Sequence, residues 1–202
     1  MSCLNIDKMT TDSDSLLGPA PRLLLWLHGC NRNCPGCIAV DWNTSSSAQY
    51  SLSVETIANL VNTNDELEGI TISGGEPFLQ AESLCALVTK INKGIIIYSG
   101  YTLEELEQMK SEAISLILRK IDVLIDGRYI EELNDDLPFR GSSNQRIHLF
   151  SDRYKEFYST VIERKTITVK KDGFLYLYGI PNKEARDEWL LLKESINKGG
   201  KV

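Results

Sequence analysis

Short apolar runs rich in β-branched residues alternate along this chain with segments that have a helical pattern. We expect strands at Leu23–Leu27, Ile70–Ser73, Ile95–Ser99, Val123–Asp126 and Arg146–Phe150. Strands separated by helical segments of about ten residues or more form βαβ units. Strands that are apolar throughout are covered on both faces. The sequence therefore predicts an α/β fold around a mostly parallel sheet.

Three segments between these strands have signals for helices. Ser53 is an N-cap candidate for a helix to about Val61, and a second helix is expected near Glu82–Lys93. Thr102 and Glu105 have the spacing of a capping box, which opens a helix that runs, with a break, towards Arg119.

The last part of the chain has a different pattern. Residues 166–170 and 174–178 are β-rich and are joined by Lys171-Asp172-Gly173, which indicates a hairpin. A final helix is expected from about Asn182 to Ile196. We therefore predict an N-terminal segment at 1–19, a core domain at 20–150, and a C-terminal appendage of a hairpin plus a helix at 151–202.

Composition excludes several classes of function. The 202 residues carry a net charge of −6 and contain no basic run, so nucleic acid is not an expected partner. The longest apolar runs are too short to span a bilayer, and no signal peptide is visible, so we expect a cytoplasmic protein without a membrane partner. Thiols in a reducing cytosol bind metals more often than they form disulfides.

Three of the five cysteines cluster after the first predicted strand. Cys30, Cys34 and Cys37 have the spacing C-x3-C-x2-C in an irregular loop, where thiolates can converge on one metal centre. A four-iron cluster held by three cysteines has one iron without a protein ligand, as catalytic metal centres do. A structural zinc site completed by His28 is the alternative.

The other two cysteines are not expected to bind the metal. Cys85 is expected to pack as a small hydrophobic residue, and Cys3 to lie in a mobile end.

Polar or glycine-rich turns follow the other predicted strands. These turns are Gly74–Pro77, Ser99–Tyr101 and Asp126–Arg128. In parallel α/β sheets, ligands bind at the carboxyl ends of the strands. The cysteine loop and these turns are therefore expected to form one site.

At this point the sequence resembles the radical S-adenosylmethionine superfamily, whose signature is C-x3-C-x2-C after the first strand of a partial (β/α)6 barrel. Ser73-Gly74-Gly75-Glu76-Pro77 resembles the Gly-Gly-Glu motif of the same superfamily. Glycines let the backbone approach a ligand closely. The two motifs together favour an iron–sulfur cluster over zinc.

Within the superfamily, the chain resembles the activating proteins of anaerobic ribonucleotide reductase. The matching stretches are Cys34–Cys37, Ser99–Leu106, Asp122–Tyr129 and Phe139–Arg146, in the order of the family, and Gly36 before the third cysteine is typical of that group. Two features depart from it: Ile38-Ala-Val-Asp-Trp42 follows the third cysteine, and the chain continues through residues 151–202.

The resemblance implies a [4Fe-4S] cluster and S-adenosylmethionine, which is cleaved reductively to a 5′-deoxyadenosyl radical. It places Gly36 and Ile38 beside the cofactor, and Gly74, Gly75 and Glu76 at its methionine end. Ser99 and Asp126 would hold its ribose or amino group, and Arg128 its carboxylate. Without the resemblance, Ser99 is a helix cap, Asp126 starts a turn with Gly127, and Arg128 is a solvated charge.

Three functions stay open at the level of sequence. The first is an activase that takes a hydrogen atom from a backbone glycine of a glycyl radical enzyme, with electrons from a flavodoxin- or ferredoxin-type donor. The second is a stand-alone radical enzyme that modifies a peptide or a small molecule. The third is a non-catalytic zinc or iron–sulfur module.

Overall fold

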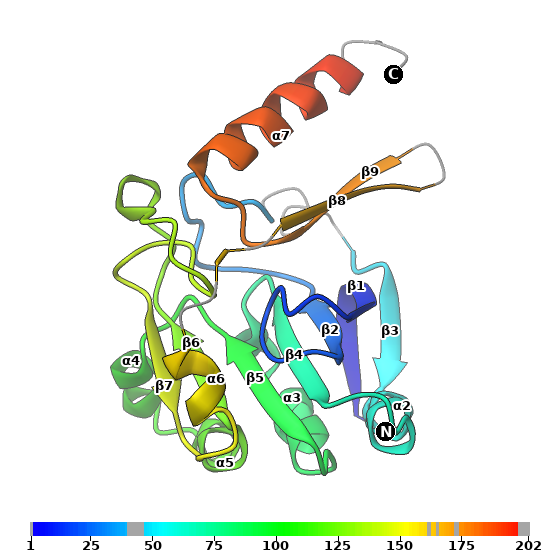
Figure 1. The fold of residues 1–202 in the computed structure, drawn as a ribbon. Helices are drawn as coiled ribbons and strands as arrows, with labels where there is room; N and C mark the ends of the chain where they lie inside the picture. Colours follow the sequence, from blue (N-terminus) through cyan, green and yellow to red (C-terminus); the bar gives the residue numbers. More distant parts are fainter. Residues whose placement is uncertain (1, 40–46, 161–162, 165, 172–173, 198–202) are drawn as a thin grey trace.

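A computed structural model describes residues 2–39, 47–160, 163–164, 166–171 and 174–197 (Figure 1). The strands are β1 (Cys3–Asp12), β2 (Arg22–Leu27), β3 (Tyr50–Ser53), β4 (Gly69–Gly74), β5 (Gly94–Tyr98), β6 (Val123–Asp126), β7 (Arg146–Leu149), β8 (Thr166–Lys171) and β9 (Phe174–Gly179). The helices are α2 (Val54–Thr63), α3 (Ala81–Val88), α4 (Leu103–Gln108), α5 (Glu112–Lys120), α6 (Lys155–Ser159) and α7 (Lys183–Asn197), with short 3₁₀ turns η1 (Pro77–Gln80) and η2 (Glu131–Leu133).

Seven strands form one sheet in the order β3-β1-β2-β4-β5-β6-β7. The central strands β2, β4, β5 and β6 are parallel, whereas β1 and β7 pair antiparallel with their neighbours. This confirms the predicted α/β class. In the described part of the chain the sheet is open between β3 and β7, and the predicted partial (β/α)6 barrel is not confirmed.

The helices begin where the predicted capping residues stand. The Ser53 side chain accepts a hydrogen bond from the amide of Thr56 and caps α2. Thr102 and Glu105 form a reciprocal capping box at the start of α4. The predicted break falls between α4 and α5, where Ser111 caps a new helix.

The main core lies between the sheet and the helices α2, α3, α4 and α5. Alternate residues of β2, among them Leu23, Leu25 and Leu27, point into this core. Leu24 and Trp26 point to the other face of the sheet, where a smaller cluster includes Leu16 and Leu17. The smaller cluster leaves room for a cavity on that face.

The N-terminal segment corrects one expectation. Cys3 does not lie in a mobile end, because it is the first residue of β1, which pairs with both β2 and β3. Leu4 and Ile6 are fully buried in the main core. The polar composition of β1 hid the strand, since only one side of its first half is apolar.

The C-terminal appendage contains the predicted hairpin and helix, and the short helix α6, which was not predicted from the sequence, precedes them. β8 and β9 pair antiparallel (Figure 1). Ile167, Tyr178 and Ile180 pack on the smaller core cluster. Residues 172 and 173 of the predicted turn lie outside the described residues, as do Asp41 and Trp42 after the cysteine loop. In the described residues no helix is both long enough and apolar enough to span a bilayer.

Candidate functional site

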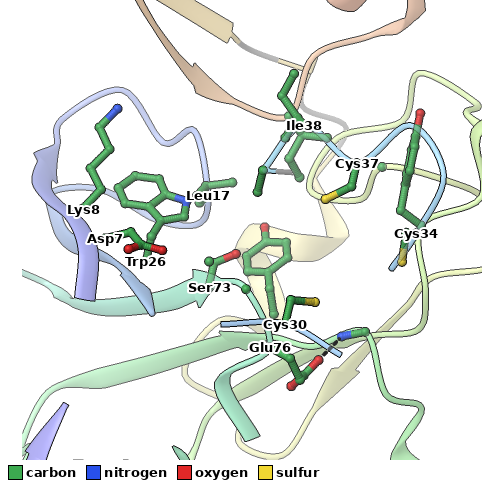
Figure 2. Close-up of a pocket in the computed structure, with 18 of the residues that line it drawn as sticks. Asp7, Lys8, Leu17, Trp26, Cys30, Cys34, Cys37, Ile38, Ser73 and Glu76 are labelled. Carbon is green, nitrogen blue, oxygen red and sulfur yellow. Dashed lines mark hydrogen bonds between the residues drawn. The ribbon is translucent and has the colours of Figure 1, made fainter. Parts of the chain in front are cut away.

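A cavity of about 980 Å³ lies at the carboxyl ends of β2, β4 and β5. Figure 2 shows the cysteine loop on one side of the cavity, and Trp26 and Lys8 on the other. The predicted site residues that line it are Cys30, Cys34, Gly36, Cys37, Ile38, Gly74, Gly75, Glu76 and Ser99. The structure therefore brings the cysteine loop and the Gly-Gly-Glu turn together, as their positions after neighbouring parallel strands predict.

The cysteine loop is shaped by three residues with positive φ. Gly29, Asn33 and Gly36 have φ of 89°, 46° and 73°, a conformation that glycine and asparagine adopt most readily. The Cys37 amide donates a 3.2 Å hydrogen bond to the carbonyl of Cys34, which closes a tight turn between the two thiols.

The donor set fits an iron–sulfur cluster, which is held by cysteine thiolates. All three thiols are free and partly buried at the cavity. Within the described residues, no three His, Cys, Asp or Glu side chains converge closely enough to hold one metal ion. In a cluster each thiolate binds a different iron, so the thiols need not meet at one point.

His28 is not placed as a fourth ligand. Its Nδ1 lies 2.9 Å from Oδ1 of Asp7, and its ring does not line the cavity. Burial raises the pKa of the Cys37 thiol, so metal binding at this residue releases a proton.

The Gly-Gly-Glu turn is packed directly on the end of β2. Gly74 has φ of 115°, and a Cβ there would lie 2.3 Å from the amide nitrogen of Leu27. The Gly75 amide donates a 2.8 Å hydrogen bond to the Leu27 carbonyl. Glycine at position 74 is therefore required by the backbone conformation and by the close approach of β2.

Glu76 is fully buried at the floor of the cavity. Its Oε1 accepts hydrogen bonds from the amide of Phe78 and the hydroxyl of Ser99, both at 3.0 Å, and its Oε2 accepts one from the amide of Gly100. Burial raises the pKa of Glu76 to about 7, against the opposing effect of these hydrogen bonds. Glu76 therefore joins the turn after β4 to the turn after β5.

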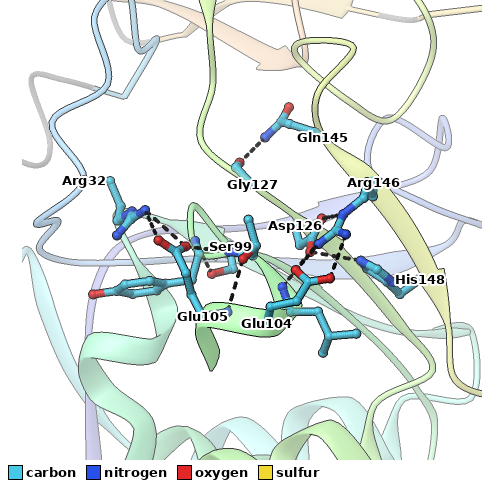
Figure 3. Close-up of polar contacts among 12 residues, drawn as sticks. Arg32, Ser99, Glu104, Glu105, Asp126, Gly127, Gln145, Arg146 and His148 are labelled. Carbon is cyan, nitrogen blue, oxygen red and sulfur yellow. Dashed lines mark hydrogen bonds and ion pairs between the residues drawn. The ribbon is translucent and has the colours of Figure 1, made fainter. Parts of the chain in front are cut away.

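Asp126 and Arg128 do not line the cavity. The buried Asp126 carboxylate accepts hydrogen bonds from the amide of Leu103 and from Arg146, which also binds Glu104 (Figure 3). Burial acts to raise the pKa of Asp126, but these hydrogen bonds outweigh it and leave the pKa below its usual value. Arg128 donates to the carbonyl of Arg32 instead.

Several cavity residues were missed in the sequence because they come from distant segments. Lys8 of β1 has its Nζ 3.8 Å from the ring centroid of Tyr178 in β9, and burial lowers the pKa of Lys8 to about 8. Arg186 and Trp189 of α7 also line the cavity. No local pattern marks these residues, since their role depends on contacts between segments far apart in the chain.

The chain is similar to known proteins over most of this region. Residues 16–148 match the model of a family described as the 4Fe-4S single cluster domain. The anaerobic ribonucleoside-triphosphate reductase-activating protein of Salmonella typhi is 35% identical over 146 residues, which cover 67% of this chain and 92% of the relative. The protein of the same name from Vibrio cholerae is 36% identical over 149 residues, covering 68% and 94%.

A more distant relative carries the same name. The anaerobic ribonucleoside-triphosphate reductase-activating protein of Enterobacteria phage T4 is 29% identical over 144 residues, which cover 66% of this chain and 87% of the relative. The family model covers more than half of the chain and includes the cysteine loop and the Gly-Gly-Glu turn. The chain therefore belongs to the 4Fe-4S single cluster domain family, in the group of the reductase-activating proteins.

Proposed function

We propose that this protein is a radical S-adenosylmethionine enzyme that generates a glycyl radical on an anaerobic ribonucleotide reductase. The observation that carries the proposal is that the three-cysteine loop and the Gly-Gly-Glu turn line one cavity. The chain shares 35% identity with a protein that is named as an activator of this reductase.

When bound, the [4Fe-4S] cluster and S-adenosylmethionine supply a one-electron reduction that yields methionine and a 5′-deoxyadenosyl radical. Cys30, Cys34 and Cys37 would hold the cluster, and the absence of a fourth cysteine in the loop leaves one iron for the cofactor. The chain itself positions the cofactor and excludes water from the radical chemistry.

The chain's own residues divide these tasks. Gly74 and Gly75 lack side chains, so backbone groups at the cavity can approach the methionine end of the cofactor. The buried carboxylate of Glu76 fixes this turn, and the hydroxyl of Ser99 donates a hydrogen bond to that carboxylate. Ile38 lies on the cysteine loop and is 37% exposed, which leaves an apolar surface for the adenine. The placement of Asp126 and Arg128 supports structural roles for these two residues.

We also propose the finer features of the fold and of its partners. The parallel strands β2, β4, β5 and β6 would correspond to the family's partial (β/α)6 barrel, within a core at 20–150 that is followed by the appendage at 151–202. The segment at 1–19 would not stand apart from this core, because its strand β1 pairs with β2 and β3 in the same sheet. The partner would be a glycyl radical enzyme in the cytoplasm, and electrons would come from a flavodoxin- or ferredoxin-type protein. No nucleic acid or membrane would take part.

A stand-alone radical enzyme for a peptide or a small molecule is the second candidate. The observation that favours it is that Tyr178 and Trp189 of the appendage line the cavity. An appendage that borders the cavity reduces the opening through which a large protein could present a glycine.

The test begins with anaerobic reconstitution using iron and sulfide, followed by S-adenosylmethionine and a chemical reductant. We expect 5′-deoxyadenosine from the wild type and none from Cys34→Ala, whereas Cys85→Ala, which removes a thiol on α3 outside the cavity, stays active. If the wild type forms no 5′-deoxyadenosine, both enzymatic functions are wrong.

Co-incubation with an anaerobic ribonucleotide reductase separates the two enzymatic candidates. A glycyl radical signal in electron paramagnetic resonance supports the activase. Formation of 5′-deoxyadenosine without that signal supports the stand-alone enzyme.

A further inference from the structure

The last helix of the chain reaches back to the cysteine loop. Arg186 on α7 is only 7% exposed, and its Nε donates a 3.1 Å hydrogen bond to the carbonyl of Gly36. The same guanidinium forms an ion pair with Glu131 in η2. Three segments that are far apart in the sequence therefore meet at Gly36, between the second and the third cysteine.

The ion pair occupies the space that a side chain at position 36 would need. A Cβ on Gly36 would lie 2.6 Å from Oε2 of Glu131 and 2.8 Å from Nη2 of Arg186. Gly36 also has φ of 73°, which disfavours other residues. The shape of the loop and the position of the ion pair therefore depend on each other.

A second arginine, Arg164, fixes the segment that carries Glu131. Arg164 donates hydrogen bonds to the side chain of Asn134 and to the carbonyl of Leu137, both in the connection between β6 and β7. It also donates to the carbonyl of Pro181, just before α7. The appendage is thus attached to this connection independently of Arg186, so α7 presents Arg186 from a fixed position.

The appendage lies outside the part of the chain that the family pattern covers. The family model ends at residue 148, whereas α7 spans Lys183–Asn197 (Figure 1). Arg186 therefore comes from outside the family model, whereas Gly36, which it contacts, lies in a loop that the family model includes.

We propose that Arg186, paired with Glu131, is a positioning residue for the cluster: it holds the loop from Cys34 to Cys37 in shape and sets the charge beside it. The inference rests on the proposed cluster. The potential of an iron–sulfur cluster depends on nearby charge and hydrogen bonding. The reduced cluster carries one more negative charge, so a cation nearby favours reduction and an anion opposes it.

The two partners therefore have opposite effects when each is removed. Arg186→Met leaves the Glu131 carboxylate unpaired near the loop and lowers the reduction potential. Glu131→Gln leaves the guanidinium in place with only the carboxylate of Asp187, 3.9 Å from its Nη1, and raises the potential. Damage to the fold alone would not separate the two variants in this way.

The first test uses the protein without its cluster and measures hydrogen–deuterium exchange in the peptide that covers residues 29–39. Arg186→Met is expected to speed exchange there about tenfold, because the loop loses a charge-assisted hydrogen bond. Lys183→Met is the matched control, since it removes an exposed positive charge from the first turn of the same helix. Equal exchange in the two variants would overturn the inference.

The second test measures the midpoint potential of the reconstituted cluster by titration followed with electron paramagnetic resonance. We expect a lower value in Arg186→Met, a higher value in Glu131→Gln, and the wild-type value in Lys183→Met. Compared with Arg186→Met, Arg186→Lys keeps the positive charge but not the donor geometry of the guanidinium. We therefore expect Arg186→Lys to have a midpoint potential close to that of the wild type, but faster hydrogen–deuterium exchange in residues 29–39 than the wild type. Shifts of the same sign in Arg186→Met and Glu131→Gln contradict the electrostatic role.

These experiments separate this inference from the proposed function. If Arg186→Met does not fold, as judged by circular dichroism, Glu131→Gln and Arg186→Lys test the same contact. An active wild type whose loop exchange is unaffected by any of these changes would contradict only the role of Arg186. An inactive wild type with faster exchange in the variant would contradict only the proposed reaction.

Discussion

The amide of Gly100 donates a 2.7 Å hydrogen bond to Oε2 of Glu76, and this bond joins the turn after β5 to the turn after β4. Both turns border the cavity, so the bond fixes two sides of the proposed cofactor site relative to each other. Glu76 is fully buried, and the donors around it supply its polar contacts. The motif glutamate therefore acts on the site by fixing its walls.

Replacing Glu76 by glutamine tests this role. In Glu76→Gln, the side-chain NH2 group replaces one of the two carboxylate oxygens. It then faces the backbone N–H of either Gly100 or Phe78, so that N–H group loses its acceptor. We expect a loss of about 1–3 kcal/mol in the free energy of unfolding, measured by urea denaturation. Glu66→Gln, at an exposed position, is the control and should change stability by less than about 0.5 kcal/mol. If Glu76→Gln is as stable as the wild type, the carboxylate of Glu76 does not fix the two turns.

The carboxylate of Asp126 makes stability depend on pH. Its pKa in the folded protein is below its usual value, so the unfolded chain binds its proton first as the pH falls. The stabilisation is complete above the usual pKa of aspartate and is lost as the pH falls through the folded pKa. The advantage of the wild type over Asp126→Asn should therefore shrink as the pH is lowered from about 5 to about 2.

Chemical denaturation at a series of pH values measures this difference. Asp65→Asn, which changes an exposed aspartate, should keep a constant difference from the wild type over the same range. A difference between the wild type and Asp126→Asn that does not vary with pH would show that the Arg146 contact does not favour the charged form.

Two glycines separate backbone strain from steric overlap. Gly74 and Gly29 both have positive φ, but a Cβ would clash with β2 only at Gly74, because nothing lies within 4 Å of one at Gly29. We expect Gly29→Ala to cost about 1–2 kcal/mol from the left-handed conformation alone. Gly74→Ala should cost about 3 kcal/mol or more, since overpacking adds to the strain. Thermal unfolding followed by circular dichroism measures both, and equal losses would exclude the steric contribution.

Arg22, the first residue of the strand that leads into the cysteine loop, is fully buried. Its Nε donates a 2.7 Å hydrogen bond to the hydroxyl of Thr71, and its other nitrogens donate to several backbone carbonyls. Arg22→Met removes the hydrogen bonds that the guanidinium donates to these buried acceptors and should destabilise the protein by about 3 kcal/mol. Arg153→Met removes a half-exposed cation whose carboxylate partners lie at 3.4 and 3.7 Å and should cost at most about 1 kcal/mol. Similar losses in urea denaturation would contradict a special role for Arg22.

Local features of the fold could be read from the sequence. The capping box of Thr102 and Glu105, the cap at Ser53 and the apolar strand Arg22–Leu27 are formed by residues that are close in the chain. These signals depend on helical or strand periodicity, which neighbouring residues encode by themselves. The meeting of the cysteine loop with Gly74 also followed, because adjacent parallel strands end at the same edge of the sheet.

Tertiary structure decided which polar side chains at the strand ends face the cavity and which bind other segments. Asp126 ends a strand beside the cavity, but its carboxylate binds Arg146 and the start of α4. β1 was missed because its residues are polar on one side, and only pairing with β2 shows which of them are buried.

Arg186 is the clearest case, since it lies 150 positions from the loop residue that it binds. The cysteines and the Gly-Gly-Glu turn identified the kind of site, because their chemistry is contained in a few consecutive residues. The surroundings of that site depend on contacts between distant segments, whose favourable energy appears only when the chain is packed. The sequence by itself determined which residues form the proposed metal site, and the tertiary structure decided which charges surround it.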